Sequence, residues 1–177
     1  RDPRSRRPLA PRHLLDEIDR VAKFKTNDFT EGQKKRNQRW KKVSKENADY
    51  QIRAFFGALY AQGFPLEAAS LSAILVTDVI DSVIDWRKRR RGGHTYTIIR
   101  VLQIFDSLLH PRFGFIAQTP DFGERLRVVP GFITQADVDR ADDWAEACRV
   151  ARAHIHTRIG DLKPLLQQGR DPFEALR

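Results

Sequence analysis

The chain has 177 residues, a formal net charge of +9, a single cysteine and no methionine, so we expect it to be part of a longer protein. No apolar run approaches the roughly 18 residues of a membrane span, which excludes the class of membrane-spanning proteins. Cys148 alone cannot build an intramolecular disulfide framework and suits a reducing compartment, so a cytoplasmic location without membrane contact is predicted.

The positive charge is concentrated at the start of the chain. Residues 1–45 hold 15 Lys and Arg against 6 Asp and Glu, whereas residues 46–177 hold 17 of each. Such asymmetry is typical of proteins that bind polyanions, so residues 1–45 are predicted to form a basic arm that contacts nucleic acid. A solvated basic tail without a partner is the alternative. The candidate contacts in this arm are Lys34, Lys35, Arg36, Arg39, Lys41 and Lys42.

Apolar residues recur at helical spacing through the first part of the chain. They predict a short amphipathic helix over about 13–24, and the basic segment 33–49 is compatible with a helix anchored by Trp40 and Val43. A clearer helical pattern follows from about residue 47. Gly63 is expected to be the first residue after the end of this helix, a position that glycine often occupies. The apolar positions of this helix are Ile52, Phe55, Phe56 and Leu59.

Two further helices are predicted on either side of a basic junction. Thr77 is expected to cap the first of them, which stops at Gly92-Gly93, and Thr95 is expected to cap the second. Pro111 lies just past the end of the second helix. The two apolar stripes are Val79, Ile80, Val83 and Ile84, and then Ile98, Ile99, Leu102, Phe105 and Leu109.

The remaining part predicts an irregular connection and one last helix. Residues 110–132 contain three Pro and three Gly, which is typical of a loop. Thr134 with Asp137 forms a capping-box pattern that starts the last helix, and Pro164 is expected to bound it. No segment alternates with period two for long enough to be a strand. The fold class is therefore all-α, a bundle of about four to six helices with a basic N-terminal arm.

The basic junction is a candidate site for binding a phosphate backbone. Five consecutive cations end one helix, and the negative end of a helix dipole favours only one or two of them. The first turn of the next helix presents unpaired N–H groups and short polar side chains, which suit phosphate and base edges. A solvated charge run is the alternative. The candidate DNA-binding residues are Arg87, Lys88, Arg89, Arg90, Arg91, His94, Thr95, Tyr96, Thr97 and Arg100.

The same residues carry a likeness to a known family. The segments "ADYQIRAFFGALYAQG", "LVTDVIDSVIDWRKRRRGG" and "TYTIIRVLQIFDSLL" follow one another, and a "P-x-x-G-F-I" turn follows them. In this order, residues 47–120 resemble the N-terminal core-binding (SAM-like) domain of tyrosine recombinases of the phage-integrase type. Thr97, Leu102 and Phe105 match the polar and apolar positions of the family's third helix.

The resemblance implies a helical half-clamp around duplex DNA, serving DNA integration and recombination in a nucleoid-associated protein. It implies a core-binding domain over 46–120. The resemblance does not cover the flanking parts, which we interpret as a basic arm with a short helix over 1–45 and a helical extension or linker over 121–177 toward an absent catalytic domain. The family's catalytic Arg, His-x-x-Arg and Tyr set is missing, since all three tyrosines lie at or before Tyr96. We therefore assign no catalytic residue and expect this chain to be inactive alone. The parent recombinase would be oligomeric on DNA, and the fragment monomeric.

Other residue groups favour structural roles. His154 and His156 are two positions apart, which places them on opposite faces of a helix rather than at one metal site. Cys148 lies in an apolar stripe, as a buried thiol does. No metal site and no cofactor is predicted. Two alternatives to a recombinase domain stay open: a regulatory DNA-binding protein with a helix-turn-helix, and a helical protein-interaction module with a basic tail.

Overall fold

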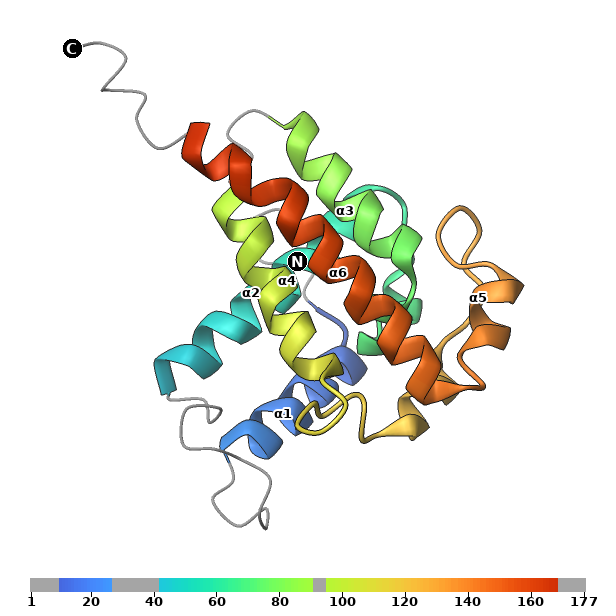
Figure 1. The fold of residues 1–177 in the computed structure, drawn as a ribbon. Coiled ribbons are helices and arrows are strands. Elements are labelled where there is room, and N and C mark those ends of the chain that lie inside the picture. The colour runs from blue at the N-terminus through green and yellow to red at the C-terminus, as the bar shows by residue number, and fades with distance from the viewer. Residues whose placement is uncertain (1–9, 27–41, 91–94, 169–177) are drawn as a thin grey trace, which may run out of the picture.

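The computed structural model describes residues 10–26, 42–90 and 95–168, and its regular elements in these ranges are helical (Figure 1). Val129 and Ile133 form an isolated antiparallel β-bridge in these ranges. The predicted all-α bundle is confirmed. The α-helices are α1 (Arg12–Thr26), α2 (Lys42–Ala61), α3 (Thr77–Arg89), α4 (Thr95–Leu109), α5 (Gln135–Arg140) and α6 (Trp144–Gln168), and the 3-10 segments are η2 (Leu66–Ala68), η3 (Leu71–Leu75) and η4 (Pro120–Arg125).

The long helix α6 lies across α3 and α4, and its closest packing is with α4 (Figure 1). One hydrophobic core joins these helices to α1 and α2. Leu14 of α1 and Ile155 of α6 are both fully buried in it. The described parts of all three predicted chain segments therefore contribute to the same core. None of the helices in the described ranges combines the length and the apolar character of a membrane span.

The apolar stripes predicted for α2, α3 and α4 are all buried, with exposed fractions of at most 4%. The predicted end of α2 is also confirmed. The Gly63 N–H donates to the Tyr60 carbonyl at 3.0 Å, and the Phe64 N–H donates to the Leu59 carbonyl at 3.1 Å. This pair of bonds is a Schellman motif, and it requires the left-handed φ of +97° that Gly63 adopts.

The structure corrects two details near the starts of α2 and α3. Val43 was expected to anchor the basic segment, but it is 75% exposed at the first turn of α2, and Trp40 lies outside the described residues. Thr77 was expected to cap α3, but the cap position is Val76. The preceding η3 buries Val76, whose carbonyl already accepts the Val79 N–H at 3.1 Å, so the helix begins one residue earlier.

The prediction of one last helix is also wrong in part. The capping box of Thr134 and Asp137 is present, yet α5 ends at Arg140 and α6 begins at Trp144. The buried Trp144 ring donates its N–H to the Ile116 carbonyl at 2.8 Å, which anchors the start of α6 to the preceding loop. Pro164 does not bound α6 but lies inside it. The carbonyl that Pro164 leaves without a donor belongs to the exposed Gly160, where water can bind it.

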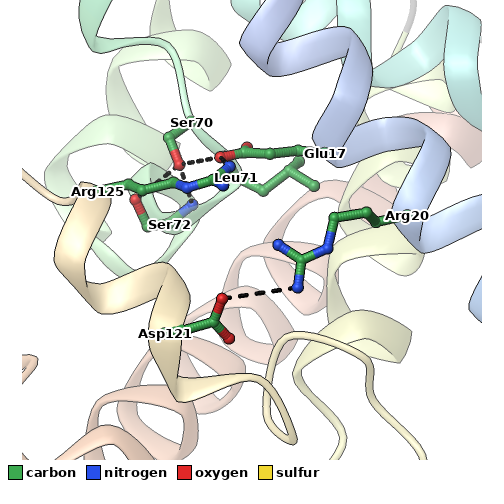
Figure 2. Close-up of polar contacts among 7 residues, drawn as sticks. All are labelled: Glu17, Arg20, Ser70, Leu71, Ser72, Asp121 and Arg125. Carbon is green, nitrogen blue, oxygen red and sulfur yellow. Dashed lines mark hydrogen bonds and ion pairs between the residues drawn. The ribbon is translucent and has the colours of Figure 1, made fainter.

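A buried carboxylate joins three segments that are distant in sequence. Glu17 of α1 is 0% exposed and accepts hydrogen bonds from the Ser70 hydroxyl at 2.8 Å and the Leu71 N–H at 2.7 Å. The guanidinium of Arg125, at the end of η4, lies 2.7 Å from the same carboxylate. Figure 2 shows the Glu17 side chain pointing toward these partners, with the Arg20–Asp121 ion pair beside it. The carboxylate thus fixes α1 against η3 and η4.

Replacing Gly114 with alanine is expected to destabilise the protein by about 3 kcal/mol, because the added methyl group would overlap neighbouring backbone atoms, which would have to shift. A Cβ atom at Gly114 would lie 2.3 Å from the Leu108 carbonyl oxygen and 2.6 Å from the backbone of His110. Gly160→Ala is the matched control, since a Cβ there meets nothing within 4 Å and alanine favours the helix by about 1 kcal/mol. Urea unfolding measures both changes, and a neutral Gly114→Ala would contradict this packing.

Candidate nucleic-acid interface

The end of α3 and the start of α4 lie at the same edge of the bundle (Figure 1). α3 ends at Arg89 and is followed by its C-cap residue Arg90, whereas α4 begins at Thr95. Only four residues separate Arg90 from Thr95, so their Cα atoms are at most about 18 Å apart. The dipoles of the two helices differ in sign at this edge, because one helix ends there and the other begins.

Eight of the ten predicted residues of the junction lie in the described ranges. Lys88, Arg89, Arg90, Tyr96 and Arg100 are exposed, and Arg87, Thr95 and Thr97 are half-buried. We call Lys88, Arg89, Arg90 and Arg100 the junction cations. Of the other candidates, Arg91, His94, Lys34, Lys35, Arg36, Arg39 and Lys41 lie outside the described residues, and the described structure gives only the backbone of Lys42, at the start of α2.

Two aromatic rings support the junction cations. The Arg90 guanidinium lies 4.4 Å from the centre of the Trp86 ring, and the Arg100 guanidinium lies 5.9 Å from the centre of the Tyr96 ring. Each pair has helical i, i+4 spacing, which places cation and ring on one face. Such contacts restrict the guanidinium groups while their N–H donors stay exposed. Trp86 was not among the predicted site residues, although its spacing to Arg90 is a signal that the sequence contains.

The local charge at the junction is strongly positive. Residues 86–105 contain six Lys and Arg and no Asp or Glu. The preceding carboxylates on α3 are paired with α6 instead: the Arg158 guanidinium lies 3.2 Å from Asp81 and 3.7 Å from Asp85. Within the described ranges, no carboxylate forms an ion pair with a junction cation. The cluster therefore presents a net positive surface that an external anion can neutralise.

The two histidines of α6 pair with different neighbouring helices. The His154 Nε2 atom lies 2.7 Å from Asp81 of α3, and the His156 Nε2 atom lies 2.6 Å from Asp106 of α4. Their placement on opposite faces was predicted. Among the described residues, no group of three or more His, Cys, Asp or Glu side chains is arranged to hold a metal ion.

Cys148 is 3% exposed, and burial raises the pKa of its thiol to about 12. We expect labelling by a thiol reagent at pH 8 to be slow, because only about one thiol in ten thousand would be ionised. Because the folded pKa lies above the unfolded value, the thiol's contribution to stability is full below about pH 9 and falls as pH rises toward 12. Labelling rates with and without urea measure this, and fast labelling of the folded chain would contradict it.

No family model, no curated protein sequence and no solved structure matches this chain. The functional interpretation therefore rests on the residues and geometry described above.

Proposed function

We propose that this chain binds duplex DNA, with the junction cations against the phosphate backbone. The observation that carries the proposal is the cluster of exposed cations at the end of α3 and the start of α4, without a paired carboxylate in the described ranges. Phosphate contacts of this kind supply most of the affinity in non-specific protein–DNA binding. Trp86 and Tyr96 support the proposal because they hold two guanidinium groups in place.

We propose further that the chain is the non-catalytic part of a site-specific tyrosine recombinase, located in the cytoplasm with the nucleoid. The likeness of residues 47–120 to a core-binding domain supports this assignment. In that arrangement the first turn of α4, with Thr95, Tyr96 and Thr97, would face a groove while the junction cations contact phosphates. A longer form of the protein would then carry a His-x-x-Arg motif and a later Tyr, and would trap a covalent adduct on nicked DNA.

Duplex DNA binding is expected to depend steeply on salt. With about five to eight phosphate contacts, the logarithm of the association constant should fall with the logarithm of salt concentration at a slope near −5 to −7. Fluorescence anisotropy of a labelled duplex between about 50 and 300 mM salt measures the slope. A helical protein-interaction module predicts no such affinity, so a flat response would exclude DNA binding. A regulatory helix-turn-helix protein predicts the same slope but no covalent adduct in the longer form.

A further inference from the structure

A second feature of the molecule is a hollow of about 460 Å³ between α4, the loop that follows it and the first half of α6. Its volume lies within the range of about 300–1,000 Å³ that small-molecule sites occupy. We call it the α4–α6 pocket. It is lined by Leu109, Pro111, Ala117, Ala145, Cys148, Arg149, Arg152, Ala153 and His156.

Small side chains on opposing walls leave this space open. Ala145 and Ala153 face it from α6, and Ala117 faces it from the loop. The hydrogen bond from the Trp144 ring to the Ile116 carbonyl fixes the start of α6 against the loop beside the pocket. The pocket is thus bounded by well-packed elements, and most of its lining is apolar.

The polar part of the lining is basic. Arg149, Arg152 and His156 line the pocket, and none of the lining residues is acidic. Arg152 and His156 both contact the same Asp106 carboxylate, at 2.8 and 2.6 Å, so two basic groups share one anion. Arg149 donates two hydrogen bonds to Glu146, at 2.7 and 2.5 Å, and both side chains are more than half exposed, so a ligand carboxylate would compete with Glu146 for this guanidinium.

The neighbouring residue His110 responds to the same positive charge. Its pKa is lowered mainly by burial and next by the nearby Arg152 guanidinium. An incoming anion at this site would meet the Arg152 and Arg149 guanidinium groups, which would exchange Asp106 and Glu146 for the new partner. An apolar hollow with this rim complements a molecule that has an apolar body and one negative group.

We propose that the α4–α6 pocket binds a small organic monocarboxylate with an apolar body, such as a medium-chain acid. The apolar chain lies against Leu109, Ala117 and Cys148, and the carboxylate pairs with Arg149 and Arg152. This inference does not rest on DNA binding. The pocket adjoins the last residues of α4 and the first half of α6, whereas the junction cations lie where α3 ends and α4 begins (Figure 1).

Titration with octanoate, octanol and octylammonium tests the proposal, with calorimetry and amide chemical shifts as the measurements. Octanoate is expected to bind saturably, about fivefold more tightly than octanol, and octylammonium more weakly than either. The shifts should be centred on Ala145, Arg149 and Ala153. Equal binding of octanoate and octanol, or shifts centred elsewhere, would overturn the proposal.

Two variants and one control complete the experiment. Ala145→Trp fills the pocket from an exposed helix position and should weaken octanoate binding at least about tenfold. Val150→Trp places the same ring at another exposed position of α6 outside the lining, and should leave binding unchanged. Arg149→Gln should lower octanoate affinity about fivefold and leave octanol affinity unchanged. If Val150→Trp and Ala145→Trp have equal effects, or if Arg149→Gln does not separate the two ligands, the assigned site is wrong.

Discussion

Replacing Lys88, Arg89 and Arg90 together with glutamine is expected to weaken duplex DNA binding about a hundredfold at 0.1 M salt and to reduce the salt slope by two to three, about 0.9 per lost phosphate contact. All three side chains are exposed, and none has a carboxylate partner within the described ranges, so their removal should leave the fold intact. Arg87 is left unchanged because it is half-buried. Anisotropy titrations at several salt concentrations measure both quantities.

A charge-matched control variant separates the effect of the junction cations on DNA binding from the effect of the net charge of the protein. Arg112, Arg127 and Arg140 are also exposed, and they belong to the segments after α4 and η4 and to α5. Figure 1 places α5 and the end of α4 away from the end of α3. Replacing these three with glutamine removes the same charge and should change affinity no more than about threefold. Equal losses in both triple variants would show that DNA responds to total charge and not to the junction.

Replacing Glu17 with alanine is expected to lower the free energy of unfolding by about 3–5 kcal/mol, the usual loss when one partner of a buried ionic network is removed. The Ser70 hydroxyl and the Leu71 N–H would stay buried without their acceptor, and Arg125 would lose its counter-ion. For a chain of this size the melting temperature should fall by about 6–20 °C. Thermal and urea unfolding measure the change.

Two further variants divide the effect of Glu17 into its parts. Glu17→Gln keeps an acceptor oxygen for the Leu71 N–H but removes the charge opposite Arg125, and should cost about 1–2 kcal/mol. Asp16→Ala, at an exposed position of the same helix, should change stability by less than about 0.5 kcal/mol. If Asp16→Ala were as harmful as Glu17→Ala, the loss would come from α1 itself rather than from the buried carboxylate.

The spacing of apolar residues predicted those helices in which the buried side chains recur with the period of an α-helix. The stripe from Ile52 to Leu59 is buried as its spacing indicates. Gly63 follows the end of α2 because the turn there needs a positive φ, which glycine adopts without strain. The capping box at Thr134 was equally visible, since both of its partners lie within one turn. These features depend on residues close together in sequence.

Features that depend on distant partners could not be predicted in the same way. Nothing near Glu17 in sequence reveals that Ser70 and Arg125 will surround it, 53 and 108 positions away. The break before α6 depends on Trp144 reaching the carbonyl of Ile116, and the continuation of α6 through Pro164 depends on an exposed carbonyl. At the candidate site, the cations were evident from the sequence, but the pairing of Asp81 and Asp85 with α6 was not.

The placement of α6 also bears on the order of events during folding. Its bonds to Asp81 and Asp106 join residues 73 and 50 positions apart, whereas five residues connect α3 to α4. Because the entropy lost on closing a loop grows with its length, the α3–α4 hairpin is expected to form first and α6 to dock on it later. During synthesis the chain emerges in the same order. Until α6 arrives, Asp81 and Asp106 remain hydrated, and the side of α4 that α6 will cover stays open to water.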